Sequence, residues 1–470
     1  MDEQSRVVLT AHPLQRVGAY ALAVLGKAAR PESLTADGLR RAMETIVTDS
    51  VNAALVRDTK SKRGFWLKCS HSFFPNSKMN HPGNGKKDDA AIREAVVEWL
   101  STPETPVRPG VACVLCGRAA VGFFGKVDVP LAESDLYRNT TPRGHEGLAL
   151  CRPCLSSFRA LPYGCRLTGG PAIALHSWDE RFMARTLSRR VERNRQLIAL
   201  GASAAEQGGL ADREVVALWA LRDYEDRLTA GVDLLVFSND NRNQSLQIQS
   251  MDQPMAEWLR RTARPPRRRG FPALLRAHAT KDRPGIAELA RNAFEAPERI
   301  AGACRRYLSA DLGRGVIRPD TGDLAALCMS FLIEVMRMNQ TEVDEINAVG
   351  RRVAAWLHQE NSAGQLRGFY ATLKDPRRMR SWLRRRDLDG LLDPNRRAEG
   401  PLITERQYRL LFDPEVESAW LHREVLVVSV VQRLHELGFK PADGAEIAAE
   451  LKEEELDHPE DREFLGEEES

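Results

Sequence analysis

The sequence contains no long apolar run. Within its 470 residues, no stretch approaches the roughly 18 uninterrupted apolar residues that a membrane-spanning helix needs. The first residues, MDEQSRVVLTAHPL, also lack the basic flank and following apolar run of a secretory leader. We therefore expect a cytoplasmic protein with no membrane partner.

Common catalytic signatures are also missing. The chain has no phosphate-binding Walker loop, no dinucleotide-binding glycine-rich turn, no Gly-x-Ser-x-Gly elbow and no His-Glu-x-x-His helix. The run LTGGP at residues 167–171 is expected to be a turn, because it lacks the lysine of a phosphate cradle. These absences argue against the most common hydrolase and nucleotide-dependent classes, and we expect a protein that is not an enzyme.

Lysine is scarce and arginine abundant, with 12 Lys against 56 Arg. Residues 451–470 hold ten acidic and two basic residues, a net charge of −8, and since the whole chain carries +3 the other 450 residues carry +11. A basic body with an acidic tail indicates a polyanionic partner such as nucleic acid. Biased codon usage and a merely solubilising tail explain the same counts, so charge alone leaves both interpretations open.

The length predicts several domains, because one domain typically spans roughly 100–200 residues. With 43% hydrophobic and 28% charged residues, the composition is that of a globular protein. We expect an α+β, multidomain fold with an N-terminal mixed α/β domain, an inserted four-cysteine zinc module and a C-terminal helical bundle. The predicted segments are 1–265 (mixed domain, with the zinc-finger module at 105–175), 266–320 (basic linker and helical connection), 321–455 (helical bundle) and 456–470 (acidic tail).

Helical patterns dominate the start of the chain. Residues 17–28 are expected to form a buried helix, and apolar residues recur at helical spacing in 33–56, where Thr35 or Asp37 stands at the N-cap position. Residues 68–89 are expected to form a long loop, because Pro, Gly and Asn interrupt both the helical and the strand period.

Two strands and several further helices are expected in the rest of the chain. Residues 232–239 and 245–250 are the best strand candidates and are joined by an Asn/Asp turn. The segment 260–284 is rich in Pro, Gly and Arg, which predicts a linker or an exposed basic segment and so a domain boundary. Beyond it, apolar residues follow the helical period in 323–339 and 342–359.

Four of the eight cysteines stand in two Cys-x-x-Cys pairs, CVLC at 113–116 and CRPC at 151–154, with 34 residues between the pairs. Without a secretory leader a disulfide framework is not expected, and paired thiolates suit tetrahedral zinc. The predicted ligands of one Zn²⁺ ion are Cys113, Cys116, Cys151 and Cys154. The other four cysteines are expected to be small buried apolar residues.

A structural zinc is favoured over a catalytic one, because four thiolates leave no open position for water. Zinc nucleobase deaminases use His-x-Glu followed by Pro-Cys-x-x-Cys, whereas here His145 directly precedes Glu146 and Pro153 lies inside the second pair. A His-Asn-His nuclease needs a catalytic histidine with acidic ligands for a second ion, and His145 alone does not supply them.

Two basic features are candidate nucleic-acid contacts. The stretch FFPNSKMNHPGNGKK combines aromatic, amide and lysine side chains on a loop, and amides and lysines can reach base edges or phosphates. A second cluster contains Arg264 and Arg267–Arg269, with further arginines at 377–386. A solvated surface, with the phenylalanines buried beneath the loop, explains the same residues equally well. The candidate DNA contacts are Asn76, Lys78, Asn80, His81, Lys86, Lys87, Arg267, Arg268 and Arg269.

The order of these motifs resembles a known family. The opening LTAHPLQRVGAYALAVLGKAARPESLTADGLRRAMETI, the FFPNSKMNHP loop, the CVLCGRAA and CRPC pairs and ALPYGCRLTGGPAIALHSWDERF together resemble the large subunit of the type I CRISPR surveillance complex Cascade, in its Cst-type, type I-B branch. The resemblance covers the N-terminal half, and the C-terminal half only as a helical pattern.

The resemblance implies a non-enzymatic role in RNA-guided defence. Such subunits read the short PAM motif in target double-stranded DNA, assist R-loop formation and recruit a helicase-nuclease, while guide pairing reads the rest of the target. It implies guide RNA, backbone and small Cascade subunits, and a helicase-nuclease or transposition proteins as partners. It also implies that Asn76, Lys78 and Asn80 lie near the PAM-proximal duplex, with Lys86 and Lys87 on phosphates.

Two alternative functions stay open. One is a zinc-containing nuclease whose active site escapes sequence inspection, and the other is a stand-alone zinc-finger DNA-binding regulator. Divalent-metal-dependent cleavage by the protein alone indicates the first, and sequence-specific DNA binding by the protein alone indicates the second.

Overall fold

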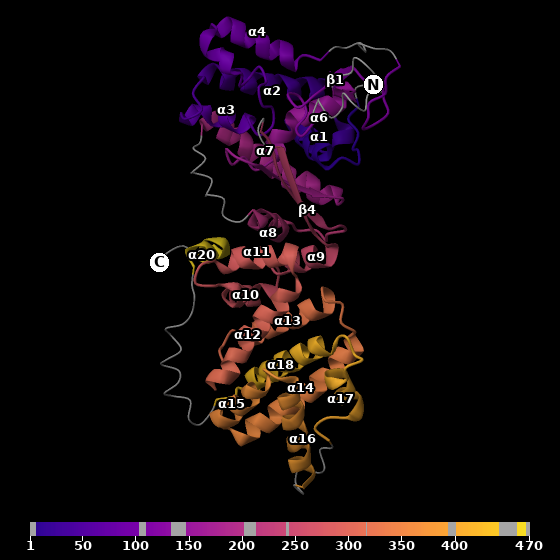
Figure 1. Cartoon of the computed structure of the whole chain (residues 1–470), viewed down its shortest axis with the longest axis vertical. Helices are drawn as coiled ribbons and strands as arrows, with labels where there is room; N and C mark the ends of the chain where they lie inside the picture. The colour runs from indigo at the N-terminus through magenta and orange to yellow at the C-terminus, as the bar shows by residue number, and fades with distance from the viewer. Residues whose placement is uncertain are drawn as a thin grey trace. The chain divides into compact units, whose positions relative to one another are not determined.

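The computed structural model describes residues 6–102, 110–132, 147–201, 213–240, 244–315, 317–392, 401–440 and 458–466. The chain divides into two compact units, here called unit 1 (Met1–Arg213 and Asp226–Gln253) and unit 2 (Glu214–Glu225 and Pro254–Ser470). Helices dominate the described residues of both, and the described strands form two small antiparallel sheets (Figure 1). No described helix is long and apolar enough to cross a membrane.

The helices of unit 1 begin where the sequence supplies caps. Thr35 is the N-cap of the second of them, because its side chain accepts a hydrogen bond from the Gly38 N–H at 3.0 Å. The first begins at Pro13, earlier than expected, because the His12 side chain caps it and proline suits a first helical position. The helices are α1 (Pro13–Leu25), α2 (Ala36–Val56), α3 (Phe65–Ser70), α4 (Asp89–Leu100), α6 (Arg152–Gly164) and α7 (Glu180–Leu200).

The predicted pair of strands forms a hairpin, in which β4 (Val232–Asn239) pairs antiparallel with β5 (Gln244–Met251). A third strand, β3 (Ala172–Ser177), pairs with the other edge of β4 and was not predicted. All six of its residues are buried, so it shows no alternation between apolar and polar residues. The second sheet contains β1 (Gly122–Phe124) and β2 (Leu148–Leu150).

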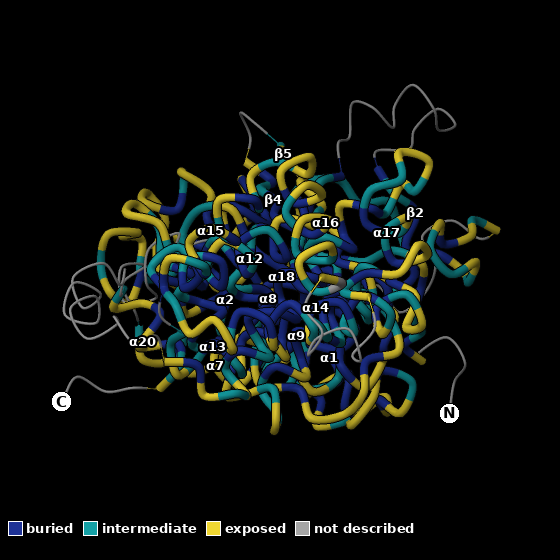
Figure 2. The backbone as a smooth tube through the Cα atoms, turned by 90° about the horizontal axis from the view of Figure 1, so that it is seen from below, coloured by how far each residue is buried: buried dark blue, intermediate teal, exposed yellow. Residues whose placement is uncertain are grey.

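The core of unit 1 forms around α1 and α6, which pack against each other. Both helices are buried along almost their whole length, as Figure 2 shows for α1 in dark blue. They approach closely at Gly18, where an added Cβ would lie 1.9 Å from the carbonyl oxygen of Ser157. Residues of the predicted zinc module share this core with α1, α2 and α7.

The regular elements described in unit 2 are all helices, and the predicted apolar faces of 323–339 and 342–359 are buried at Leu324, Phe331, Val343 and Val353. The elements are α8 (Glu214–Asp223), α9 (Gln253–Arg261), η6 (Arg267–Gly270), α10 (Phe271–His278), α11 (Gly285–Glu295), α12 (Glu298–Arg314), α13 (Thr321–Glu334), α14 (Gln340–Glu360), α15 (Ala363–Thr372), α16 (Pro376–Leu392), α17 (Glu405–Phe412), α18 (Ala419–Glu436) and α20 (Pro459–Leu465).

The segment 260–284 is part of unit 2 and does not link the two units. It forms η6 and α10, and Phe271 and Leu274 are fully buried. The segment was expected to be a linker or an exposed basic segment. It keeps exposed arginines at Arg268 and Arg269, and its apolar residues have the spacing of a short helix. The predicted boundary at residue 265 therefore lies inside unit 2.

Part of the acidic tail is also folded. Within α20, the Asp461 carboxylate accepts hydrogen bonds from the backbone N–H groups of Gly285 at 2.7 Å and Ile286 at 2.6 Å, and so caps the start of α11. Phe464 packs against Trp219 and Phe271. This stretch of the tail is thus a structural element of unit 2 rather than a solubilising extension.

Candidate metal centre and nucleic-acid contacts

The first cysteine pair stands on a tight turn. The Cys113 N–H donates to the Arg118 carbonyl at 2.6 Å, and the Gly117 N–H donates to the Cys113 carbonyl at 2.9 Å. Gly117 has φ +76°, a conformation that glycine adopts without strain. This turn directs Cys113 and Cys116 to the same side of the backbone.

The second cysteine pair opens α6. Cys151 is the N-cap residue and Cys154 lies in the first turn, with Pro153 between them. A helix N-terminus favours thiolate over thiol, because its unpaired N–H groups carry partial positive charge. The sequence therefore places two cysteines that can serve as metal ligands at the start of a helix.

The small sheet brings the two pairs together. Gly122 of β1 lies opposite Leu150 of β2, and the Val114 N–H donates to the Ala149 carbonyl at 3.0 Å. All four Sγ atoms consequently lie within 4.8 Å of one another, and those of Cys116 and Cys151 are 3.5 Å apart. Among the residues that the structure describes, this is the one group of three or more metal-ligating side chains gathered so closely.

The donor set fits a tetrahedral metal ion. With metal–sulfur bonds of about 2.3 Å, neighbouring sulfurs of a tetrahedral site lie about 3.8 Å apart, close to the spacing here. Hydrogen bonds to Cys113 and Cys151, together with burial, raise the pKa of Cys154, because a second thiolate beside the first is unfavourable without a cation. A dication at the centre reverses this preference, so the four cysteines can hold one metal ion.

The remaining four cysteines are buried as predicted, namely Cys69, Cys165, Cys304 and Cys328. His145 and Glu146, weighed above for deaminase or nuclease chemistry, lie outside the described residues.

The helix that carries the second cysteine pair also anchors α4. The buried Arg159 guanidinium of α6 donates to the carbonyl oxygens of Leu100 at 2.7 Å and Trp99 at 2.9 Å, and to the Thr102 hydroxyl at 2.8 Å. Burial lowers the pKa of Arg159 to about 10, and the nearby Asp128 carboxylate opposes this shift. Arg159 thus ties α6, the helix that begins with the second cysteine pair, to the end of α4.

The predicted loop at 68–89 is more ordered than expected, since α3 ends inside it and a 3-10 helix, η4 (Pro82–Lys86), closes it. Phe73 and Phe74 are buried, and their rings pack on Phe237 and Trp99. These phenylalanines support the loop from beneath and are not available to stack on bases.

The six candidate contacts in the loop divide into two groups. Asn80 is 8% exposed, and its amide donates to the Ser70 hydroxyl at 2.9 Å and to the Phe74 carbonyl at 3.0 Å. Its side chain therefore holds the loop together and does not reach a ligand, which removes it from the candidate contacts. The exposed residues are Asn76, Lys78, His81, Lys86 and Lys87.

Two of these exposed residues also have local roles. Asn76 has φ +58°, in the left-handed region that asparagine tolerates better than most residues. The His81 Nδ1 accepts a hydrogen bond from the Gly83 N–H at 3.0 Å. Lys78, Lys86 and Lys87 have exposed side chains.

One buried asparagine that the sequence did not single out connects the loop to its surroundings. The Asn239 amide donates to the carbonyl oxygens of Phe73 at 2.6 Å and Lys126 at 2.8 Å. Its oxygen accepts from the Leu131 N–H at 3.0 Å and from the Gln244 side chain at 2.7 Å. No local sequence signal could have identified Asn239, because three of its partners lie 166, 113 and 108 residues away along the chain.

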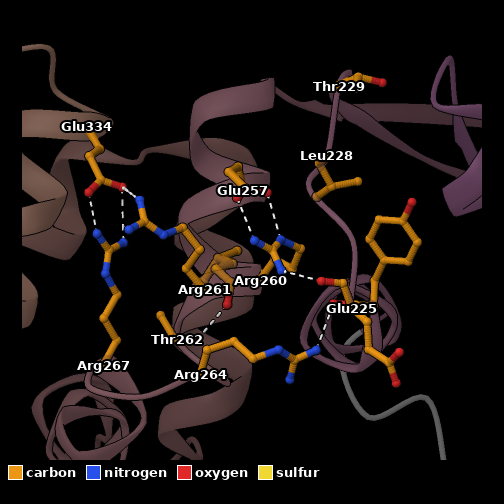
Figure 3. A network of polar contacts seen from close by, with 12 residues as sticks. Glu225, Leu228, Thr229, Glu257, Arg260, Arg261, Thr262, Arg264, Arg267 and Glu334 are labelled. Carbon is orange, nitrogen blue, oxygen red and sulfur yellow. Dashed lines mark hydrogen bonds and ion pairs between the residues drawn. The ribbon is translucent and has the colours of Figure 1, made fainter.

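The predicted arginine cluster in unit 2 also divides into paired and unpaired residues, and Figure 3 shows the pair that Arg267 forms with Glu334. Arg267 forms a two-pronged ion pair with Glu334, which also pairs with Arg261 at 3.0 Å. Arg267 is thereby neutralised within unit 2. Arg268 and Arg269 are exposed, and no carboxylate of a described residue pairs with them.

The arginines at 377–386 lie on α16. Arg377, Arg380 and Arg384 follow one another at helical spacing and are exposed. Arg386 is half-buried, pairs with Asp389 at 2.9 Å and stacks 4.6 Å from the Trp356 ring centroid. The exposed arginines form a basic face suited to phosphates or to solvent alone.

Comparisons with known proteins gave no match among family models, curated proteins or solved structures.

Proposed function

We propose that the chain is the large subunit of a type I CRISPR surveillance complex of the Cascade kind. In this role it binds target double-stranded DNA, reads the PAM, assists R-loop formation and recruits a helicase-nuclease or transposition proteins. Guide RNA and the backbone and small subunits are its other partners. The order of motifs in the N-terminal half is the basis of this proposal, and it entails an N-terminal mixed domain with an inserted zinc module, followed by a helical bundle.

The observation that supports the proposal most directly is that hydrogen bonds tie the loop to the LTGGP turn and to the cysteine module within unit 1. The Ser72 hydroxyl donates to the Gly170 carbonyl of the LTGGP turn at 2.5 Å. Asn239 then joins Phe73 of the loop to Lys126 and Leu131 of the cysteine module. A protein that reads a short DNA motif from a loop needs that loop held by a rigid support, and these contacts supply one.

One structural Zn²⁺ ion would supply the remaining rigidity. Cys113, Cys116, Cys151 and Cys154 would hold it with a closed thiolate shell, which leaves no position for substrate or activated water. The ion would keep β1, β2 and the start of α6 in register, and through Asn239 it would fix the loop at 71–87.

The DNA contacts of the proposed role are the exposed loop residues. Lys78, Lys86 and Lys87 supply positive charge for phosphates, and Asn76 and His81 supply hydrogen-bonding groups for base edges or backbone. In unit 2, Arg268 and Arg269 are the arginines of the predicted cluster without an ion-pair partner among the described residues.

The test uses the assembled complex and the isolated chain. We expect PAM-dependent binding of duplex DNA by the complex with guide RNA, and a loss of about tenfold or more when Lys78, Lys86 and Lys87 are all replaced by alanine. The exposed Lys440→Ala serves as the matched control. Unchanged binding by the triple variant contradicts the assignment of the loop.

The isolated chain separates the alternatives. Divalent-metal-dependent DNA cleavage by the chain alone would support a nuclease, and sequence-specific binding by the chain alone would support a stand-alone regulator. The proposed role predicts neither, and it predicts one tightly held zinc per chain.

A further inference from the structure

Unit 2 contains a cavity of about 300 Å³, and one of its lining residues, Arg268, is also a candidate DNA contact. Its walls come from α8, from η6 and the residues that flank it, and from α20. Trp219 and Phe464 form an aromatic side, while Arg222, Asp223 and Arg268 supply polar groups. Asp223 already has an interaction partner within the protein.

Arg222 is held rigidly at this cavity. Its guanidinium carbon lies 3.4 Å from the centroid of the Phe271 ring and 5.5 Å from that of Phe464. One N–H donates to the Thr262 hydroxyl at 2.5 Å, and no carboxylate of a described residue pairs with the side chain. Four of its five N–H donors therefore have no described partner in the protein.

Two further arginines lie near Arg222. Burial and the neighbouring Arg268 and Arg264 lower the pKa of Arg222 to about 9. Arg264 is fixed nearby, because it donates to the Tyr224 carbonyl at 3.0 Å, a contact drawn in Figure 3. Arg222, Arg264 and Arg268 thus lie near one another, and the carboxylate that also lines the cavity, that of Asp223, already has an interaction partner within the protein.

Other arginines of the same segment form ion pairs within unit 2. Arg260 pairs with Glu257 at 2.7 Å, and Arg261 and Arg267 share Glu334. Arg222, Arg264 and Arg268, which lie at or beside the cavity, have no ion-pair partner among the described residues. Such a cluster is suited to an anion, because the anion relieves the repulsion and accepts the unused N–H groups.

We propose that this cavity binds a phosphate group, carried by a free nucleotide or by a nucleic-acid strand. Arg222 and Arg268 donate hydrogen bonds to the phosphate oxygens, and Arg264 adds positive charge. The Trp219 ring, which is 49% exposed, offers a flat surface beside the site for the attached base. This assignment shares Arg268 with the DNA contacts proposed above, but it is argued from the cavity and does not require the Cascade role.

The test measures binding to the isolated full-length chain at constant ionic strength. The probes are inorganic phosphate, a nucleoside 5′-monophosphate and a short single-stranded oligonucleotide, titrated by calorimetry and by thermal shift. We expect saturable binding, with an affinity at least about tenfold weaker in Arg268→Gln, because a charge-assisted hydrogen bond is lost. Arg269→Gln is the matched control, because Arg269 is adjacent and exposed but does not line the cavity.

The comparison of probes identifies the source of the phosphate. Equal affinity for the monophosphate and the oligonucleotide indicates a site for a free nucleotide. A much higher affinity for the oligonucleotide indicates a site for a nucleic-acid strand. Absence of saturable binding by every probe overturns the proposal, as does an equal effect of Arg268→Gln and Arg269→Gln. Both arginines are exposed, so neither substitution should disturb folding. Guide-dependent PAM binding is measured separately, so either proposal can fail without the other.

Discussion

Replacement of Asn239 by alanine should release the loop at 71–87 from its support. Asn239 is fully buried, and its side chain satisfies the carbonyl oxygens of Phe73 and Lys126 and the N–H of Leu131. The substitution leaves these three backbone groups without a partner. At about 1 kcal/mol for each unsatisfied buried group, the local structure should lose ~3 kcal/mol.

Hydrogen exchange measured by mass spectrometry reports this loss directly. The amides at 72–80 and 125–131 should exchange roughly 100-fold faster in the Asn239→Ala variant, because ~3 kcal/mol corresponds to about two factors of ten in the opening equilibrium. Amides of α14 in unit 2 serve as an internal control, and Asn52→Ala, an exposed asparagine on α2, serves as the control variant. Exchange at 72–80 that changes by less than about threefold would refute the reasoning.

Three further perturbations test other parts of the molecule. Cys116→Ser should abolish stoichiometric zinc binding, measured by elemental analysis, and should impair assembly of the complex. The control Cys165→Ala, at a buried cysteine outside the cluster, should retain the metal. A Cys116→Ser chain that is soluble, free of zinc and able to assemble would show that the metal is dispensable. Burial raises the pKa of Glu424, a residue of α18 that pairs with Arg305 at 2.8 Å, from 4.5 to about 7, and Arg305 opposes this shift. The folded state therefore holds the proton more tightly than the unfolded state, and its stability should fall as the pH rises from 4.5 to about 7. The melting temperature of Glu424→Gln should lack this decline, and an equal decline in both proteins would contradict the assignment. Phe464→Ala should weaken the packing of α20 on unit 2 by about 3 kcal/mol and speed limited proteolysis at the C-terminal end. The control Glu463→Ala, at an exposed residue, should not change the proteolysis rate. Equal proteolysis rates for the two variants would contradict docking through Phe464.

Features set by neighbouring residues could be predicted from the sequence. An N-cap at Thr35 or Asp37, the β4–β5 hairpin and each Cys-x-x-Cys pair depend on spacings of a few residues. The structure places the cap at Thr35, forms the hairpin and gathers the four cysteines. Strand β3 escaped prediction because a short, fully buried strand has no period that separates it from a buried helix.

Features set by distant partners could not be predicted. From the sequence alone, Asn76 and Asn80 are equally plausible DNA contacts in the loop. In the structure, the Asn80 amide is hydrogen-bonded to Ser70 and Phe74, while Asn76 is exposed. Asn239 is one polar residue at the end of a strand, and its role depends on where Phe73 and Lys126 are placed by the rest of unit 1.

The arginines at 267–269 show most clearly why a charge pattern alone cannot define a binding surface. All three have the same charge and neighbouring positions, but Glu334, 67 residues away from Arg267, cancels the charge of that residue. Arg268 instead lies at the cavity with Arg222, a residue that stands in an ordinary helical sequence and was not a candidate. The positive charge available to a ligand is the charge left after internal pairing. For this protein, a comparison of Arg268→Gln with Arg269→Gln is therefore a sharper test of phosphate recognition than removal of the whole cluster, which would also break the Arg267–Glu334 pair inside unit 2.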